Sequence, residues 1–485
     1  MAKMLIGGEL VDSVSGATYE VRNPATGELV DTAPKGTAAD VDQAVQAAES
    51  AFKEWADSTP EDRADALTSA CHLIEEHRSE IAELLTKEQG KTLFEAGLEV
   101  HHLLHGLQFY AGLASKVRGA QVPLPQKGAY GMVLRQPIGI CAGIVPWNFP
   151  LTLMGTKVGP ALAAGNSIII KPASTTPLAT IRTMELIQQA TYAGGKKTLP
   201  AGTVNVVTGP GSTVGEAILS HPKIRRIAFT GSTEIGRHVM EVAGREIKRV
   251  TLELGGSDPM IVMEDGNIDA AIKSADVGRF FNAGQMCLGV KRLYLQESIA
   301  DKFLDGFADL ISKKTVGNGM KRESRMGPLH LDYQRSEIEE QMDDARTRGA
   351  KVLVGGGRPE GDDLGQGFYY NPTLLTDVPT DAKVSREEVF GPVLPIYRFT
   401  DIDEAIERAN DSIYGLGSSI WTRNLLWANK AIERIEAGNV WVNSLHYGYD
   451  ELPFGGIKQS GLGREHGPEA LDYYFEQKGV VIVNI

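Results

Sequence analysis

Apolar residues in the first part of the chain recur with the period of a helix. From residue 40 onward they fall at the i, i+3, i+4 and i+7 positions, which are occupied by Val41, Ala44, Val45, Ala48, Phe52 and Trp55. This spacing places them on one face of a helix, and Asp40 is a residue type that caps a helix start. Two further stretches, at about 61–87 and 92–116, have the same character. Long helices are therefore predicted up to about residue 116.

Between Ile138 and Leu254 the pattern changes to short apolar runs separated by segments of helical length. The runs GICAGIV, SIIIK, VNVV, RIAFTG and VTLEL have the length and composition of buried strands. The separating segments cover residues 155–164, 177–193, 212–220 and 234–245. Alternating strands and helices imply parallel strands joined by right-handed crossovers. A doubly wound sheet is therefore predicted.

A second alternating series follows residue 287. Its predicted strands are RLYLQ, AKVLVGG, VLPIYRF, GLGSSIWT and GNVWVN, and its predicted helices lie near 298–314, 331–348, 402–410 and 424–436. At 485 residues the chain is also too long for one ordinary hydrophobic core. We therefore predict an α/β protein with two doubly wound α/β domains.

Two segments stand outside this alternation. Residues 119–137 are rich in Pro and Gly and interrupt the first domain, and the chain ends in the apolar run GVVIVNI, residues 479–485. An apolar strand at a terminus is usually a core strand, but an unpaired edge can also pair with another subunit. Both interpretations stay open for this terminal run.

Composition and charge exclude several classes of partner. The chain is 42% hydrophobic and 23% charged, as expected of an ordinary globular protein, and its formal net charge is −13. An acidic chain is a poor match for nucleic acid or an anionic membrane surface, because both need clustered Lys and Arg. The most apolar region, residues 138–170, is interrupted by prolines, asparagines and a lysine, so no membrane span is predicted.

Cysteine usage favours a reducing compartment. Cys71, Cys141 and Cys287 are too few and too scattered for a disulfide framework, and no C-x-x-C pair is present to bind zinc. The N-terminus also lacks the apolar run and the cleavage site of a signal peptide. A cytoplasmic protein without a metal site is therefore expected.

Two segments after predicted strands could bind a phosphate or a nucleotide. In FTGSTEIG, Gly231 and Gly236 bracket a helix start, where free backbone N–H groups and the helix dipole attract anions. The spacing matches neither G-x-G-x-x-G nor a P-loop, so an ordinary turn is an equally good interpretation. In IIIKPAS, Lys171 follows a strand at the edge where open α/β sheets bind ligands. A lysine that only extends towards solvent explains this position equally well.

Two polar residues in apolar surroundings suit catalytic groups. In VPWNFP two prolines hold the backbone around Asn148, whose amide could donate to an oxyanion or could simply cap its own turn. Glu253 interrupts the apolar strand of LELGGSDP, where burial would raise its pKa towards the range of a general base. A structural ion pair is the alternative for Glu253, and the catalytic interpretation is favoured.

The third cysteine stands in the stretch NAGQMCLGVKR, which has no histidine, carboxylate or second thiol. Cys71 and Cys141 fall in helical and strand patterns that accept a small apolar residue. Cys287 instead follows Gly284 at a predicted helix end, where free backbone amides could stabilise a thiolate. Cys287 is therefore the candidate nucleophile.

Seven motifs together carry a resemblance to a known family. PWNFP, IIIKPAS, FTGSTEIG, LELGGSDP, GQMC, EEVFGPV and PFGGIKQSGLGRE occur in an order and at separations that resemble the NAD(P)-dependent aldehyde dehydrogenase superfamily, in its hydrolytic, non-acylating branch. The resemblance covers essentially the whole chain. It implies a Rossmann-like cofactor domain (1–118 and 138–254), a catalytic domain (255–455), and a small β oligomerisation element (119–137 and 456–485).

The resemblance also implies a role for each matching residue. Cys287 would be the nucleophile, Glu253 the general base and Asn148 the oxyanion donor. NAD or NADP would be bound by Trp147, Lys171, Ser174, Gly231, Ser232, Gly236, Glu388 and Phe390. Lys157 and Glu476 match positions of a proton relay in part of the family. The implied reaction oxidises an aldehyde to the carboxylic acid through a cysteine thiohemiacetal and a thioester, which a glutamate-activated water hydrolyses.

Some positions depart from the commoner family pattern. Ser174 replaces the glutamate that usually follows KPA in NAD-selective members and would repel a 2′-phosphate, so NADP or dual use is expected. The substrate pocket is expected to be lined by Phe149, Thr152, Met286, Leu288, His446 and Tyr447, although His446 on its loop could simply be solvated. No clustered arginines are evident to bind a phosphate or a second carboxylate. A small hydroxyaldehyde, or a medium-chain or aromatic aldehyde, is therefore the expected substrate.

Two other functions stay open as alternatives. A CoA-acylating dehydrogenase would resolve the thioester with CoA, but some acylating members lack the base that Glu253 supplies here. A non-catalytic binding protein of the same fold would be expected to lose the nucleophile, the base or the oxyanion donor, and all three are present. The resemblance further implies a homo-oligomer, either a dimer or a dimer of dimers.

Overall fold

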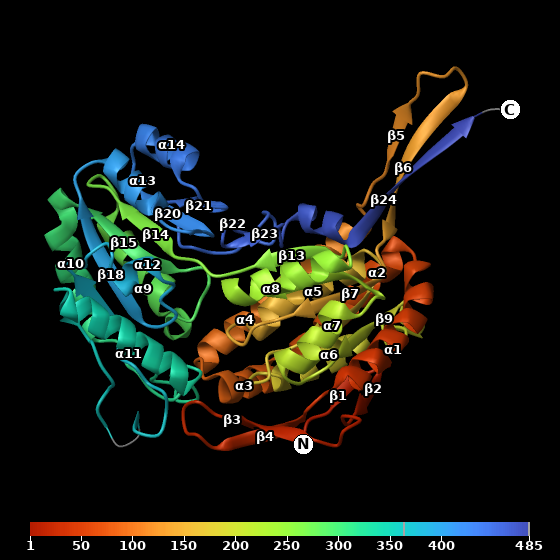
Figure 1. The fold of residues 1–485 in the computed structure, drawn as a ribbon, viewed down its shortest axis with the longest axis horizontal. Helices are drawn as coiled ribbons and strands as arrows, with labels where there is room; N and C mark the ends of the chain where they lie inside the picture. Colours follow the sequence, from red (N-terminus) through yellow and green to blue (C-terminus); the bar gives the residue numbers. More distant parts are fainter. Residues whose placement is uncertain (362–363, 484–485) are drawn as a thin grey trace.

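The structure, a computed structural model, describes residues 1–361 and 364–483. Two large β-sheets covered by helices form its body, and a narrow third sheet projects from one end (Figure 1). The predicted α/β class with two doubly wound sheets is confirmed. Within the described ranges, no helix is long and apolar enough to cross a membrane.

The first large sheet has a parallel centre and antiparallel edges. Its eight strands, in spatial order, are β2 (Glu9–Val11), β1 (Met4–Ile6), β11 (Val204–Val206), β8 (Ser167–Lys171), β7 (Ile140–Ile144), β12 (Ile224–Thr230), β13 (Arg249–Glu253) and β23 (Gly461–Leu462). The five strands from β11 to β13 are parallel, and these are the five runs that the apolar pattern predicted. The short edge strands β1 and β23 pair antiparallel with them.

Helices cover both faces of this sheet because successive strand residues point to opposite sides. Ile168 and Ile170 of β8 lie in one apolar core and Ile169 lies in the other. The covering helices are α1 (Ala38–Ala56), α2 (Pro60–Glu76), α3 (Arg78–Gln89), α4 (Leu93–Ala114), α5 (Pro150–Ala163), α6 (Leu178–Gln188), α7 (Glu216–Ser220), which follows the wide turn η1 (Gly211–Gly215), and α8 (Thr233–Arg245). α2 to α6 pack on the side of Ile168, whereas α7 and α8 pack on the side of Ile169.

Two predicted helices differ from those observed. The helix expected at about 61–87 is two helices, because His77 leaves the helical conformation (φ −105°, ψ 12°) and separates α2 from α3. The helix expected at 177–193 ends at Gln188, and a short hairpin follows, formed by β9 (Thr191–Tyr192) and β10 (Lys197–Thr198). The apolar pattern continues across both breaks, which explains why it concealed them.

The second large sheet has seven strands. In spatial order they are β16 (Lys351–Val354), β17 (Thr373–Thr376), β18 (Val393–Phe399), β15 (Val290–Gln296), β14 (Asp258–Val262), β20 (Gly417–Trp421) and β21 (Asn439–Val442). All neighbours are parallel except β16 and β17. Its helices are α9 (Ile268–Phe280), α10 (Glu297–Ser312), α11 (Asp332–Thr347), α12 (Lys383–Arg386), α13 (Ile402–Asn410) and α14 (Leu425–Arg434). β14, α9 and β17 were not predicted, and the Asp-Pro pair that opens β14 resembles a turn more than a strand.

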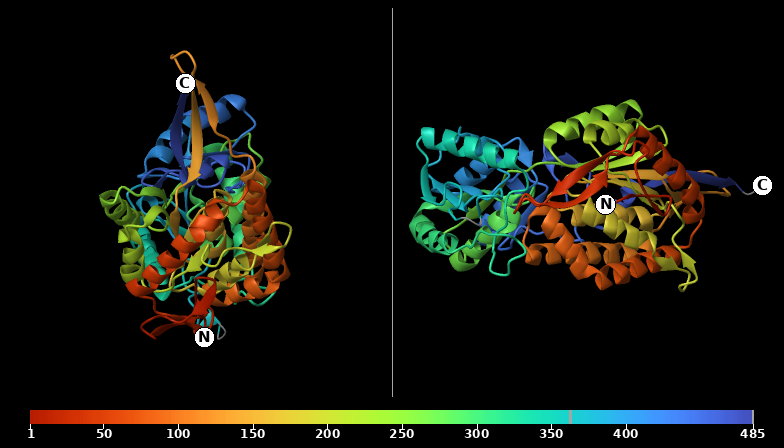
Figure 2. Two further views of the ribbon diagram at one scale, coloured as in Figure 1. Left: turned by 90° about the vertical axis from the view of Figure 1, so that its right-hand side faces the viewer. Right: turned by 90° about the horizontal axis from the view of Figure 1, so that it is seen from below.

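The third sheet is formed by segments from the middle and the end of the chain. β24 (Phe475–Val483) pairs with β6 (Ala129–Pro137), which pairs with β5 (Ala120–Pro123). The sheet extends away from the body, and β24 runs outward along it (Figures 1 and 2). Val481 is 65% exposed and Val483 is 42% exposed, so a core strand is the wrong interpretation of the described part of the terminal run. Residues 484 and 485 of that run lie outside the described residues.

The remaining short elements are a hairpin of β3 (Thr18–Arg22) and β4 (Leu29–Pro34), a pair formed by β19 (Tyr414–Gly415) and β22 (Ile457–Lys458), and the helical turns η2 (Phe281–Gly284) and η4 (Pro468–Tyr474). The carboxyl ends of β7, β8, β12 and β13 point towards one edge of the first sheet, where ligands of open α/β sheets bind. Asn148, Lys171, Gly231 and Glu253 all lie at or just beyond these strand ends.

Candidate active site

The nucleophile candidate lies in a loop with unusual backbone geometry. Between α9 and β15, Asn282, Ala283 and Gly284 have φ values of 51°, 53° and 73°. A residue other than glycine in this region costs about 1 to 3 kcal/mol and persists only where the surroundings hold it. A Cβ on Gly284 would lie 2.3 Å from the carbonyl oxygen of Gly391, so only glycine fits there. The strained turn sets the position of Cys287, three residues further on.

The Cys287 thiol sits at the floor of a pocket between the two large sheets. Burial raises the pKa of Cys287 to about 12, and the negative charge of Glu388 adds to the shift. The backbone N–H of Leu288 acts in the opposite direction but does not outweigh burial. The predicted stabilisation of a thiolate by a free amide is therefore present but smaller than the effect of burial, and the thiol needs a base.

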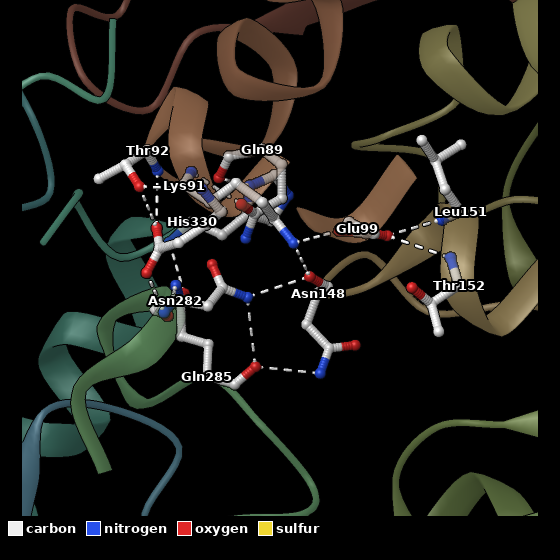
Figure 3. Close-up of polar contacts among 11 residues, drawn as sticks. Gln89, Lys91, Thr92, Glu99, Asn148, Leu151, Thr152, Asn282, Gln285 and His330 are labelled. Atoms are coloured by element: carbon white, nitrogen blue, oxygen red, sulfur yellow. Dashed lines mark hydrogen bonds and ion pairs between the residues drawn. The ribbon is translucent and has the colours of Figure 1, made fainter. Parts of the chain in front are cut away.

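The oxyanion donor candidate follows β7, in the loop that leads into α5. Asn148 is buried, and its side-chain Nδ2 donates to the carbonyl oxygen of Gln285 at 3.0 Å, two residues before Cys287 (Figure 3). This bond uses one of the two N–H groups of the amide. The amide therefore reaches across to the cysteine loop, which argues against the alternative of an asparagine that only caps its own turn.

The base candidate ends β13. Glu253 is 3% exposed, and within the described residues neither of its carboxylate oxygens has a hydrogen-bond partner. Burial, together with the nearby carboxylate of Glu465, raises the pKa of Glu253 well above its usual range. A Cβ on Gly455 would lie 2.7 Å from Oε1, so this glycine leaves room beside the carboxylate. An unpaired buried carboxylate fits a general base better than the structural ion pair that was the alternative.

The Lys157 ammonium is buried beside Glu465 instead of Glu476. Its Nζ lies 2.8 Å from Oε1 of Glu465 and 2.8 Å from the hydroxyl of Thr230. Glu476 forms ion pairs with Arg225 and Arg249, so the predicted pairing of Lys157 with Glu476 is wrong. The sequence did carry the correct signal, because the quoted motif PFGGIKQSGLGRE ends on Glu465.

Residues predicted to bind the adenosine half of a dinucleotide line the edge of the first sheet. Lys171 is buried, burial lowers its pKa to about 8, and its Nζ donates to the carbonyl oxygen of Pro172 at 3.1 Å. Ser174 donates to the carbonyl oxygen of Gly209 at 2.9 Å. Ser232 caps the N-terminus of α8, where helix N–H groups favour phosphate. A Cβ on Gly231 would meet the Phe229 ring at 2.6 Å, so the turn needs glycine.

α8 then packs closely against the sheet. A Cβ on Gly236 would lie 2.5 Å from the Leu254 side chain, so this glycine brings the helix near its strand. Together the turn, the helix N-terminus and the buried lysine form a cradle that fits a dinucleotide.

The nicotinamide-binding candidates face this cradle from the second sheet. Glu388 accepts hydrogen bonds from the backbone N–H of Gly256 and from Lys291 Nζ, both at 3.1 Å. Phe390 meets Trp147 edge to face at 5.5 Å, and Trp147 stacks on His330 at 4.7 Å. The two sheets thus supply the two ends of one cofactor site, and the residues present fit NAD or NADP.

A cavity of about 360 Å³ opens onto Cys287. All six predicted pocket residues line it, namely Phe149, Thr152, Met286, Leu288, His446 and Tyr447. His446 is not solvated, because it is 8% exposed, stacks on Trp441 at 4.9 Å and has its Nδ1 3.6 Å from Asp258. Most of the remaining lining is apolar, and none of the lysines and arginines in residues 1–361 and 364–483 contributes to it.

The sequence did not reveal a polar group in the part of the cavity wall that is formed by His102, Asp450 and His466, which is called the far wall below. Asp450 lies 2.7 Å from Nδ1 of His466 and 2.6 Å from Nδ1 of His105. Burial alone would raise the pKa of Asp450, but these histidines outweigh it and hold the pKa below its usual range. Burial and the neighbouring His101 lower the pKa of His102 to about 4, so His102 lines the cavity as a neutral imidazole.

Comparisons with known proteins agree with this geometry. Residues 10–480 match the model of the aldehyde dehydrogenase family. The chain is 40% identical to the putative aldehyde dehydrogenase DhaS of Bacillus subtilis, over 99% of this chain and 95% of the relative. It is also 40% identical to the succinate-semialdehyde dehydrogenase [NADP(+)] GabD of Escherichia coli, over 99% and 97% of the two chains.

A solved structure gives the same result. The crystal structure of betaine aldehyde dehydrogenase from Staphylococcus aureus in complex with NAD+ superposes with a TM-score of 0.94 at 37% identity, covering 99% of this chain and 94% of the other. The resemblance predicted from seven motifs is thereby confirmed. The chain belongs to the aldehyde dehydrogenase family and is an NAD(P)-dependent aldehyde dehydrogenase.

Proposed function

We propose that this enzyme oxidises an uncharged medium-chain or aromatic aldehyde to the carboxylic acid. The observation that carries the proposal is the cavity at Cys287, which is lined mainly by apolar side chains and in which Asp450 is the only acidic residue among those that the structure describes. A ligand cavity of this size suits a molecule larger than acetaldehyde. A neutral imidazole at His102 can also hydrogen-bond a hydroxyl group on such a substrate.

The residues around Cys287 support nucleophilic catalysis followed by hydrolysis. Cys287 Sγ adds to the carbonyl carbon as its proton leaves towards Glu253, and the Asn148 amide stabilises the resulting oxyanion. The bound nicotinamide supplies the hydride acceptor. Loss of the hydride from the thiohemiacetal carbon leaves a thioester on Cys287, and Glu253 passes the thiol proton on towards Glu465. Glu253 then takes a proton from a water molecule, whose oxygen attacks the thioester carbon, so that the carbon–sulfur bond breaks and the acid and the Cys287 thiolate are released. The pair of Lys157 and Glu465 lies beside Glu253 and supports its proton exchange.

The cavity disfavours an aldehyde that carries a second carboxylate. A buried carboxylate without a partner is costly, and no lysine or arginine lines the cavity to pair with it. The negative charge of Asp450 on the far wall would add repulsion. This chain is therefore expected to differ in substrate from GabD, whose name states succinate semialdehyde as its substrate.

Steady-state kinetics with four aldehydes test the substrate class. We expect kcat/KM to be highest for hexanal and benzaldehyde, lower for glyceraldehyde, and at least about tenfold lower for succinate semialdehyde, the equivalent of one lost ionic contact. A preference for the semialdehyde would contradict the proposal. Product analysis with and without CoA separates the hydrolytic reaction from the acylating alternative, because hydrolysis gives the free acid in both cases.

We further propose that the enzyme uses NADP or both cofactors. Ser174 offers a hydroxyl and no negative charge at the position beside Lys171, so nothing in its side chain repels a 2′-phosphate. Comparison of kcat/KM for NADP and NAD tests this point. A strong preference for NAD would contradict it.

We also propose a cytoplasmic homo-oligomer with the predicted division into domains. The projecting sheet of β5, β6 and β24 exposes Val122, Leu134 and Val481, which a second copy of the chain would cover. The free state of Cys71, Cys141 and Cys287 suits a reducing compartment. Light scattering of the full chain should give the mass of a dimer or tetramer, and a monomer would refute the proposed assembly.

A further inference from the structure

Lys91 carries a fully buried charge that the chemistry above does not use. It lies in the connection between α3 and α4 and is 1% exposed. Its Nζ contacts the carboxylate of Glu99, lies 2.7 Å from the backbone carbonyl oxygen of Asn148, and stands 4.1 Å from the centre of the Phe149 ring. Removing an ion pair from water costs free energy. This buried pair therefore needs an explanation beyond stability.

The backbone carbonyl group that Lys91 binds connects the loop of Asn148 to the loop of Cys287. The same Asn148 oxygen accepts a second hydrogen bond, at 3.0 Å, from Nδ2 of Asn282 in the strained turn before Cys287 (Figure 3). The side-chain amide of Asn148 meanwhile donates to Gln285 in that turn. The residue that would stabilise the oxyanion is thus joined to the nucleophile loop at both its backbone and its side chain.

Glu99 fixes the other side of Asn148. Its Oε1 accepts hydrogen bonds from the backbone N–H groups of Leu151 at 2.8 Å and Thr152 at 3.3 Å, in the first turn of α5 (Figure 3). A carboxylate is favoured at a helix N-terminus by the free N–H groups and the dipole. The ion pair therefore holds Asn148, two residues before α5, through Lys91 and holds the start of α5 through Glu99.

A second carboxylate on α4 holds the nucleophile loop by a hydrogen bond in the same way. Glu95 lies one helical turn before Glu99, and its Oε1 accepts the backbone N–H of Asn282 at 2.7 Å. Its Oε2 accepts the N–H and the hydroxyl of Thr92 at the start of α4. Residues four apart share one helix face. One face of α4 thus holds both the nucleophile loop and the oxyanion loop.

We propose that Lys91 and Glu99 are positioning residues that set the distance between the Asn148 amide and Cys287. They touch neither substrate nor cofactor, and they act on the reaction through Asn148. An oxyanion donor must lie within a few tenths of an ångström of its position to be effective. Loss of the pair should therefore lower kcat while leaving cofactor affinity and the aldehyde KM almost unchanged.

A double-mutant cycle on the full-length enzyme tests this inference. Lys91→Met in the wild-type background should lower kcat by about 10- to 100-fold, which is part of the effect of losing an oxyanion donor. In an Asn148→Ala background the same substitution should lower kcat by less than about threefold, because the side-chain amide that Lys91 positions is absent. An equal loss in both backgrounds would show a purely structural role and overturn the inference.

Matched controls keep the test decisive. Lys87→Met places the same substitution on the exposed face of α3 and should leave kcat unchanged. If Lys91→Met does not fold, Glu99→Gln takes its place in the cycle, since it keeps an oxygen for the α5 amides but loses the charge. Thermal unfolding and NADP titration confirm that each variant is folded. The inference rests on the proposed hydrolytic chemistry. If that chemistry fails, the wild-type enzyme will be inactive. If the wild type is active but Lys91→Met lowers kcat equally in both backgrounds, only the inference is refuted.

Discussion

The two ends of the substrate cavity are held in different ways. At the reacting end, Asn148 and the loop of Cys287 are joined by buried hydrogen bonds that involve backbone groups, and α4 holds both. At the far wall, Asp450 and His466 hold each other by a side-chain contact, and Tyr447 is 37% exposed and packs against other rings. Backbone-anchored geometry resists change, whereas side-chain contacts can be altered one at a time. We therefore expect the reacting end to tolerate substitution less well than the far wall.

The largest expected effect comes from removing the nucleophile at the reacting end. Cys287→Ala should reduce aldehyde oxidation by roughly 10⁵-fold, because knocking out a covalent nucleophile removes the whole pathway. NADP binding, measured by titration, should persist. Cys71→Ala serves as the control for loss of a thiol and should keep wild-type kcat, since Cys71 is buried among the helices. Near wild-type activity of Cys287→Ala would break the assignment of the site.

The second effect separates the two halves of the reaction at the same end. Glu253→Gln should lower steady-state kcat by about 10² to 10⁴-fold, because hydrolysis of the thioester then lacks its general base. A burst of reduced cofactor, close to one per active site, should still form in stopped-flow measurements, but more slowly than in the wild type, because Glu253 also takes the proton of the Cys287 thiol. Glu476→Gln on the surface should behave as wild type, whereas Glu465→Gln should slow turnover by disturbing Lys157.

The pKa of the thiol gives a pH test of the resting enzyme. With the pKa of Cys287 raised to about 12, the thiolate fraction grows about tenfold for each pH unit below that value. Alkylation by iodoacetamide without cofactor should therefore be roughly 100-fold faster at pH 9 than at pH 7, followed by mass spectrometry of the Cys287 peptide. A plateau between these pH values would show a thiolate already present at neutral pH.

The smallest effect concerns the far wall and should leave the chemistry intact. Asp450→Asn removes one negative charge from the cavity, so kcat/KM for succinate semialdehyde should rise about tenfold while that for hexanal stays within about twofold. Asp472→Asn, at the exposed ion pair with Arg135, is the matched control. If kcat/KM changed equally for both substrates, Asp450 would affect the reaction itself, and the distinction between the reacting end and the far wall would fail.

The sequence revealed residues whose chemistry conflicts with their surroundings. Glu253 interrupts an apolar strand and Asn148 follows one. The structure places Glu253 at the end of β13, and it places Asn148 in the loop after β7, where its side chain contacts the cysteine loop. Lys91, Glu95 and Glu99 gave no such signal, because charged residues at the start of a helix are normally exposed. They are buried only because two distant loops fold over that end of α4. Long-range burial of this kind is not visible in local patterns.

Tyr447 at the far wall was predicted, but the polar group beside it was missed for a related reason. His102 and His105 are on α4, whereas Asp450 and His466 come from the last part of the chain. Each of these residues alone resembles an ordinary surface position. Only tertiary contact between segments about 350 residues apart brings them into one group.

The late position of Glu465 in the chain has a consequence for biosynthesis. All strands of the second sheet come before Glu465 in the chain, and its partner Lys157 precedes it by 308 residues. During translation the cofactor cradle and the cysteine loop can therefore form while the carboxylate beside Glu253 is still missing. The last part of the chain supplies Glu465, β23 and β24 together, so completion of the ion pair between Lys157 and Glu465 coincides with completion of the projecting sheet.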